Sequence, residues 1–247
     1  MLDQEREKLI ADLLSQKAFV SLQEVVAACG ASAVTVRRDF TRMEAQGLLE
    51  RIHGGAKSTM ENLPLDIRRT VMFEEKTRIA EKAVAMCADG ETVFIDGGST
   101  TSQMAAHLKP RRLEIVTNSL VLATALLDSR NELVLTGGSV LPRQGLVLNP
   151  FEDDLIDRYR AAKAIMGVGG LDPVGPTNDE PRLIRFEQKM IAHADEIILL
   201  ADSAKLGKRE KLLLCEYSKI SAIITDSNLA PEHRAWLDKL PLTLITV

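Results

Sequence analysis

From residue 74 onward, short apolar runs alternate with helical patterns, and this alternation is the feature that most constrains the fold. Strands that alternate with helices are joined by right-handed crossovers, which makes neighbouring strands parallel. We therefore expect a larger, mostly parallel α/β domain over residues 74–247. The sequence predicts its strands at Thr92–Asp96, Leu113–Thr117, Glu132–Thr136, Lys163–Val168, Glu196–Ala201, Ala222–Thr225 and Leu242–Val247.

Residues 1–57 have a different pattern, with three short helical segments followed by a β-prone run. Ser21 and Glu24 form a capping box at the start of the second helix, and Gly30 marks its end. Ser32 is placed to cap the third helix, and Gly54-Gly55 suits the tip of a hairpin. We expect a helix-turn-helix with a wing over residues 1–57, a linker over residues 58–73, and the α/β domain from residue 74.

The composition is that of a globular protein, with 247 residues, 45% hydrophobic and 27% charged. No apolar run approaches the roughly 18 residues of a membrane helix, and the charged start lacks the apolar core of a signal peptide. Cys29, Cys87 and Cys215 are odd in number and far apart, which argues against a disulfide framework and favours a cytoplasmic location. Since the net charge is −4, any nucleic-acid binding has to come from a local patch.

Such a patch is predicted on the third helix and the wing. Val36, Phe40 and Met43 recur at helical spacing, which turns the opposite, arginine-bearing face outward. Arginine pairs bidentately with guanine and with phosphate. Residues 33–57 carry five Lys or Arg and three acids. The candidate DNA-binding residues are Ser32, Thr35, Arg37, Arg38, Thr41, Arg42, Arg51, His53 and Lys57.

Two residues of this region allow more than one interpretation. His53 is either an exposed polar residue of the wing or a contact to phosphate or the minor groove. Asp39 either contacts a cytosine or orients a neighbouring arginine such as Arg42, three positions on. We favour the second interpretation of Asp39, because an acid beside DNA costs affinity.

Small polar residues follow most of the predicted strands. In a parallel sheet these carboxyl ends lie on one rim, where ligands bind. Glycine lets the backbone approach a ligand, and Ser99-Thr100-Thr101 at a helix start would cradle an anion. Lys163 and Lys205 are the candidate cations. The candidate ligand-binding residues are Asp96, Gly97, Gly98, Ser99, Thr100, Thr101, Thr117, Asn118, Ser119, Gly137, Gly138, Lys163, Gly169, Gly170, Asp202 and Lys205.

The motif around Asp96 is neither a Walker sequence nor a dinucleotide fingerprint, since the required Gly-Lys-Ser/Thr and Gly-x-Gly-x-x-Gly patterns are missing. A small phosphorylated ligand therefore fits better than ATP or NAD, and we expect no cofactor. His107, His193 and His233 lack metal-ligand spacing, so we expect no metal site.

Long motifs in both parts resemble the DeoR family of bacterial regulators of sugar metabolism. They are Arg6-x3-Ile10-x3-Leu14, Ser32-x2-Thr35-Val36-Arg37-Arg38-Asp39-Phe40, Arg51-Ile52-His53-Gly54-Gly55-Ala56, and the strand-end groups at Asp96–Thr101, Thr117–Ser119, Gly137-Gly138, Lys163-Ala164 and Asp202–Lys205. The resemblance implies a winged helix-turn-helix joined to a domain similar in fold to ribose-5-phosphate isomerase. It also implies a repressor whose operator affinity is controlled by a sugar phosphate. Because one winged helix reads few base pairs, we expect a homo-oligomer on a repeated site.

Two other functions compete with that expectation. A sugar-phosphate isomerase-like enzyme would use carboxylates such as Asp96, Asp172, Asp179 and Glu180 as acid and base. It would have no need for residues 1–57, so we expect a regulator and not an enzyme. A scaffold whose winged helix contacts protein is the third possibility, and DNA binding distinguishes it from the first.

Overall fold

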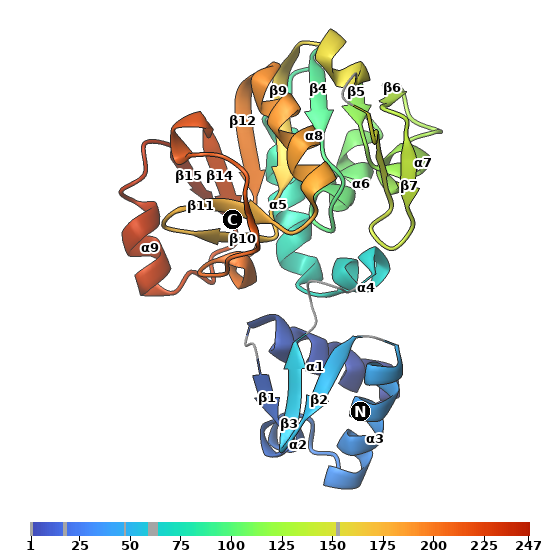
Figure 1. The fold of residues 1–247 in the computed structure, drawn as a ribbon, viewed down its shortest axis with the longest axis vertical. Coiled ribbons are helices and arrows are strands. Elements are labelled where there is room, and N and C mark those ends of the chain that lie inside the picture. The colour runs from blue at the N-terminus through green and yellow to red at the C-terminus, as the bar shows by residue number, and fades with distance from the viewer. Residues whose placement is uncertain (1, 17–18, 47, 59–63, 152–153) are drawn as a thin grey trace. The chain divides into compact units, whose positions relative to one another are not determined.

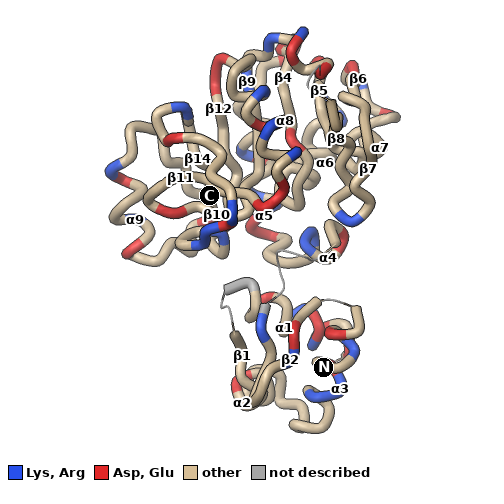
Figure 2. The backbone as a smooth tube through the Cα atoms, in the orientation of Figure 1, with Lys and Arg blue, Asp and Glu red and all other residues tan. Residues whose placement is uncertain are grey.

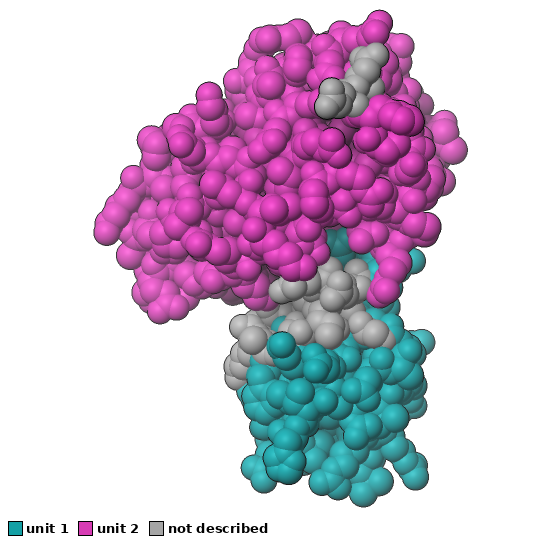
Figure 3. Space-filling model, in the orientation of Figure 1, with its two compact units in different colours: residues 1–72 teal, residues 73–247 magenta. Residues whose placement is uncertain are grey.

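The computed structural model describes residues 2–16, 19–46, 48–58, 64–151 and 154–247. The chain forms two compact units, residues 1–72 and 73–247 (Figure 3). The linker expected over residues 58–73 falls partly on residues 59–63, which lie outside the described residues. Its later part contains a helix that the sequence pattern did not indicate, α4 (Leu65–Thr70), and Val71 beyond it is buried in the core of the first unit.

The first unit holds the three expected helices and the expected hairpin (Figure 1). An additional short strand pairs with the hairpin, giving an antiparallel sheet in the order β1-β3-β2. The elements are α1 (Asp3–Gln16), β1 (Phe19–Ser21), α2 (Leu22–Cys29), α3 (Ala33–Ala45), β2 (Leu49–Ile52) and β3 (Gly55–Ser58).

Local capping explains where the two helices of the helix-turn-helix begin. The Ser21 hydroxyl accepts a hydrogen bond from the Glu24 backbone N–H, as the capping box predicts. Gly30 ends α2 in the left-handed conformation, with φ of 68°. The Ser32 side chain then caps α3 by accepting from the Thr35 backbone N–H. Three residues therefore separate α2 from α3, which is the spacing of a helix-turn-helix.

The second unit contains all seven predicted strands in one parallel sheet, ordered β15-β14-β12-β9-β4-β5-β6. They are β4 (Thr92–Ile95), β5 (Glu114–Thr117), β6 (Glu132–Leu135), β9 (Ala161–Gly167), β12 (Ala194–Leu200), β14 (Ala222–Thr225) and β15 (Thr243–Thr246). The helices are α5 (Phe73–Ala85), α6 (Met104–Leu108), α7 (Leu120–Ala125), α8 (Pro181–Ala192) and α9 (Pro231–Leu237).

Short additional elements decorate this sheet. Two small antiparallel sheets were not predicted, formed by β7 (Ser139–Leu141) with β8 (Leu146–Leu148), and by β10 (Gly170–Asp172), β11 (Gly175–Asn178) and β13 (Leu212–Leu213). Single 3-10 turns are η2 (Thr101–Gln103), η3 (Leu155–Arg158), η4 (Ser203–Lys205) and η5 (Tyr217–Lys219).

Alternating side chains of the strands bury both faces of the main sheet. Val93 and Ile95 of β4 pack into one apolar cluster, while Phe94 between them packs into the other. The first cluster includes buried residues of α5, α6 and α7, and the second includes those of α8. The second unit is therefore a three-layer α/β domain, as the strand–helix alternation predicts.

Among the described residues, no helix is both long enough and apolar enough to span a bilayer.

Gly55 is a glycine that the packing of β1 against β3 requires. A Cβ atom at Gly55 would lie 2.1 Å from the Val20 carbonyl oxygen, whereas one at Gly54 would meet nothing within 4 Å. Gly54→Ala should cost about 1–2 kcal/mol, because its φ of 84° is left-handed. Gly55→Ala should cost more, because backbone atoms have to move. Urea unfolding followed by circular dichroism tests this, and equal stability of the two variants would contradict it.

Candidate functional sites

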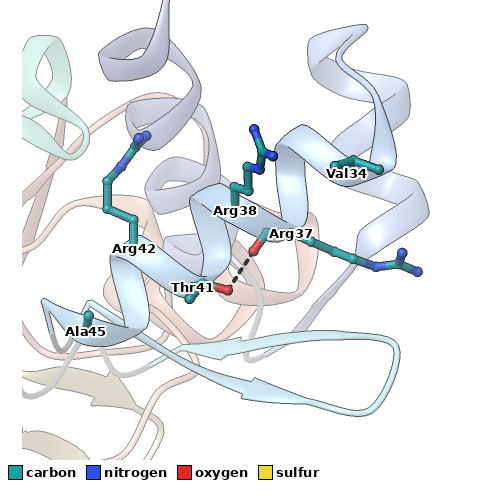
Figure 4. Close-up of a pocket in the computed structure, with 6 residues that line it drawn as sticks. All are labelled: Val34, Arg37, Arg38, Thr41, Arg42 and Ala45. Carbon is teal, nitrogen blue, oxygen red and sulfur yellow. Dashed lines mark hydrogen bonds between the residues drawn. The ribbon is translucent and has the colours of Figure 1, made fainter.

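The outward face of α3 presents arginine and a hydroxyl beside small apolar groups. Val34, Arg37, Arg38, Thr41, Arg42 and Ala45 line one shallow hollow on this face (Figure 4). Arg37 and Arg38 are exposed, and no side-chain partner is found for either among the residues that the structure describes. Positive charge therefore gathers along α3, as Figure 2 shows. The predicted division of this helix into a buried apolar face and an outward face is confirmed, because Val36, Phe40 and Met43 are buried.

Arg42 has less freedom than the sequence indicates. Its Nε donates to Glu7 Oε1 at 2.6 Å, and its Nη2 donates to Asp39 Oδ1 at 2.9 Å. Asp3 of α1 lies 3.4 Å from the same guanidinium. The hydrogen bond with Glu7 raises the pKa of Arg42. Since the side chain is still 40% exposed, an anion from solvent would have access to it but would compete with three carboxylates.

Asp39 anchors α3 to α1 through a buried ion pair. Asp39 is 1% exposed and Arg6 is 6% exposed. Arg6 Nε donates to Asp39 Oδ2 at 2.8 Å, and this hydrogen bond raises the pKa of Arg6. The interpretation that Asp39 orients Arg42 is confirmed by their contact, and Arg6 is a second partner that the sequence did not reveal. Asp39 is therefore a positioning residue.

Arg51 of the wing forms hydrogen bonds with residues of α3. Arg51 Nη1 donates to Thr41 Oγ1 at 2.7 Å, and its backbone N–H donates to Glu44. His53 and Lys57 are exposed in the hairpin, which agrees with either interpretation of His53. At the other end of α3, Ser32 is the N-cap, and its hydroxyl also forms a hydrogen bond of 2.9 Å with the Thr35 hydroxyl.

In the second unit, the structure brings the carboxyl ends of β4 and β5 together. Asp96 Oδ1 accepts a hydrogen bond from Asn118 Nδ2 at 2.9 Å, and Asn118 Oδ1 accepts one from the Gly97 N–H at 2.8 Å. Thr117 donates to the Ile95 carbonyl, and Ser119 caps α7. These residues form a polar rim at adjacent strand ends, as predicted.

Ser99, Thr100 and Thr101 are buried on this rim next to Gly98. They lead into η2 and the five-residue helix α6, so the helix they open is short. A short helix contributes little dipole, and anion binding here has to depend on backbone N–H groups and hydroxyls.

Four further glycines lie at strand ends and allow close packing or unusual turns. Gly137 and Gly138 have φ of 70° and 123°. A Cβ at Gly170 would lie 2.5 Å from the Lys208 carbonyl oxygen, and one at Gly169 would lie 2.9 Å from Asn178 Oδ1. Gly169 and Gly170 are therefore explained by packing of the chain on itself.

The expected position of Lys163 is wrong. Lys163 pairs in register with Val93 near the start of β4, so it lies toward the amino ends of the strands. Its Nζ donates to Glu91 Oε1 at 2.8 Å, which satisfies its charge there. The expectation conflicted with the predicted strand itself, because a residue at the start of a parallel strand lies opposite the rim at its carboxyl end, and Lys163 is in fact the third residue of β9.

A different lysine lies beside the rim. Lys76 of α5 is buried, and its Nζ lies 3.7 Å from Oδ2 of Asp202, which follows β12. The position of Lys76 just after the expected linker favours a solvated surface residue, and its burial shows that this expectation is wrong. Lys205, in η4, donates its backbone N–H to the Asp202 carbonyl. Helix α5 also packs against η2, which begins at Thr101.

A second carboxyl contacts Asp96. Glu187 of α8 is fully buried, accepts two hydrogen bonds from Asn178 Nδ2 at 2.7 and 2.8 Å, and makes side-chain contact with Asp96. Burial and the neighbouring Asp96 raise the pKa of Glu187 well above its ordinary value. Sequence reasoning missed the contact between Asp96 and Glu187, because the two residues are far apart in the chain.

Models of a known family match both units. A model described as the DeoR-like helix-turn-helix domain matches residues 6–62, and the DeoR C terminal sensor domain matches residues 72–227. A helix-turn-helix joined to a sensor domain defines a DNA-binding transcriptional regulator and not an enzyme. The chain belongs to the DeoR family.

Named relatives are similar over nearly the whole chain. The HTH-type transcriptional regulator GlpR of Haloferax volcanii is 31% identical, with 99% of this chain and 98% of that protein covered. The glycerol-3-phosphate regulon repressor of Escherichia coli is 32% identical over 90% of each chain. UlaR of Salmonella arizonae, also an HTH-type transcriptional regulator, is 28% identical over 100% of each.

The chain is less similar in sequence to solved structures than to these named relatives. Ribose 5-phosphate isomerase A from Methanocaldococcus jannaschii is 16% identical over 55% of each chain, with a TM-score of 0.41. The eIF2B beta subunit from Chaetomium thermophilum is 12% identical over 90% of this chain and 77% of that one, with a TM-score of 0.46.

Removing the carboxylate of Glu7 should strengthen DNA binding through Arg42. Glu7→Gln should tighten binding to a random-sequence duplex about two- to fivefold, which is the range of one exposed ion pair. Fluorescence anisotropy at fixed salt measures this. Glu5→Gln is the matched control, since it removes the same charge from α1 but its carboxylate binds the Leu2 N–H. Equal effects of the two variants, or an undiminished effect of Glu7→Gln in an Arg42→Ala background, would contradict the competition.

The raised pKa of Glu187 makes stability depend on pH. The folded state keeps this proton to higher pH than the unfolded state, so stability falls as pH rises above about 4.5 toward the folded-state pKa. Glu187→Gln carries no such proton. The free energy of unfolding of the variant, relative to wild type, should therefore increase between about pH 5 and pH 8. Urea denaturation at both pH values tests this, and a constant difference would show that Glu187 does not titrate in this way.

Proposed function

We propose that the chain is a cytoplasmic repressor of a sugar-metabolism operon whose affinity for operator DNA is controlled by a phosphorylated sugar. The observation that carries this proposal is the combination, in one chain, of a DNA-binding helix-turn-helix and a polar rim at the ends of parallel strands. The relative named as the glycerol-3-phosphate regulon repressor supports a small phosphorylated effector.

On the DNA side, α3 enters the major groove and the wing contacts the backbone. Arg37 and Arg38 carry charge that no described side chain neutralises, so they are the principal contacts. Arg42, Arg51 and Thr41 take part after giving up intramolecular partners. Ser32 and Thr35 lie at the helix start, and His53 and Lys57 extend along the phosphates. Two copies of the chain bind a repeated operator.

On the effector side, the phosphate binds the backbone and hydroxyls of Gly97–Thr101. Lys76 and Lys205 supply positive charge next to Asp202. Asp96, Asn118 and Ser119 orient the sugar hydroxyls from the ends of β4 and β5. The segment Gly137-Gly138 borders the same rim after β6. An effector changes DNA affinity only through its different affinities for two conformations of the chain.

The direct test of control is a titration of operator-bound protein with a panel of sugar phosphates. At least one should release the DNA, and operator DNA should weaken the binding of that compound by the same factor, because coupling is reciprocal. The same compound at 100 times its Kd should stabilise the chain by about 2.7 kcal/mol in a thermal-shift assay. No shift in DNA affinity with any of the compounds would contradict control by a phosphorylated sugar.

Ser99→Asp should separate effector control from DNA binding. A carboxylate at this buried position repels a phosphate in the Gly97–Thr101 segment, so release by the active compound should need at least about tenfold more of it. Binding of the operator without effector should stay at the wild-type value, since Ser99 lies in the second unit. Ser99→Ala, which adds no charge, is the control. Unchanged release from Ser99→Asp would place the phosphate elsewhere.

A further inference from the structure

Val34 is an apolar residue on the DNA-facing side of α3. It is the second residue of the helix and is 59% exposed, and it does not take part in the apolar core of the described part of the first unit. Figure 4 shows it at one end of the hollow that also contains Arg37 and Arg38. The sequence interpretation omitted it, because it considered only polar residues as DNA contacts.

Stability of the isolated unit does not account for valine at this position. A β-branched side chain loses rotamer freedom in a helix, and alanine has the higher helix propensity. An exposed valine also leaves apolar surface in contact with water. A partner outside the unit is therefore the natural source of favourable packing.

The chemistry of the major groove limits that partner to one group. Residues near the start of the second helix of a helix-turn-helix contact base edges. Val34 has no donor or acceptor in its side chain, so it cannot pair with the polar atoms of those edges. The C5-methyl group of thymine is the apolar group that the base edges present in the major groove.

We propose that Val34 packs against the C5-methyl group of a thymine in the operator. This inference rests on DNA binding by α3. Arg38 lies four residues after Val34, so the two side chains are neighbours on one helix face. The thymine is accordingly next to, or one base pair from, the base or phosphate that Arg38 contacts. Val34 thus sets specificity, whereas Arg37 and Arg38 supply most of the affinity.

Replacing thymine by uracil removes only the methyl group and tests the contact directly. A duplex is first enriched from a randomised library on the full-length wild-type chain, and each thymine is then replaced singly by deoxyuridine. Replacement at one position, or at its symmetry-related pair, should weaken binding about fourfold per site, the value of one buried methyl group. Replacement at the other positions should leave the Kd unchanged.

The protein variant completes a double-mutant cycle. Val34→Ala should bind the thymine duplex with the affinity that wild type has for the uracil duplex, and should lose nothing further when uracil is introduced. The variant should fold normally, because Val34 is exposed and alanine favours the helix. Arg38→Ala is the control, since it weakens binding but retains Val34 and should retain the sensitivity to uracil.

Three results would overturn the inference, and they differ in whether specific DNA binding by this chain also fails. If no thymine of the enriched duplex is sensitive to uracil, the methyl contact does not exist, although DNA binding stands. If Val34→Ala keeps the full sensitivity, another residue contacts the methyl group. If wild type enriches no sequence at all, specific DNA binding by this chain fails, and the inference about Val34 fails with it.

Discussion

The proposed DNA-binding surface depends on the buried ion pair between Arg6 and Asp39. Asp39 faces inward on α3 among Val36, Phe40 and Met43, and a carboxylate in such surroundings needs a charged partner. Arg6 of α1 supplies it with a hydrogen bond of 2.8 Å. Because this bond fixes α3 relative to α1, it also determines which arginines point outward. An acid within an arginine-bearing helix thus serves to position that helix.

The fold could be predicted almost completely from local patterns. The strands of the second unit are continuous apolar runs because both faces are covered by helices, and such runs are visible in the sequence. All seven were found, with end errors of up to two residues. The missed elements, such as β1 and α4, are three and six residues long. Tertiary contacts stabilise elements of that length more than local propensity does, so the sequence carries little signal of them.

The sequence predicted the positions of many site residues but not their partners, because side chains that meet in a site come from segments far apart in the chain. Helical spacing placed Arg37 and Arg38 outward, and the parallel sheet brought Asp96 to Asn118. The sequence pattern did not reveal that Arg42 pairs with Glu7. It also did not reveal that Lys76 pairs with Asp202, which lies 126 positions later in the chain. Such partners come from elements whose faces are known only once the fold is known.

The pairing of charges on α3 favours a regulator that is easily released. Non-specific affinity for DNA depends on how many phosphates are neutralised, and the chain has a net charge of −4. Glu7 and Asp39 hold Arg42, and Thr41 and Glu44 hold Arg51, so part of the arginine charge is already used within the unit. In the proposed complex with operator DNA, binding would then depend more on base contacts, which would be lost together when α3 leaves the groove. Under the proposed control by an effector, a coupling of only about 1–3 kcal/mol between effector and DNA would then be enough to change operator occupancy.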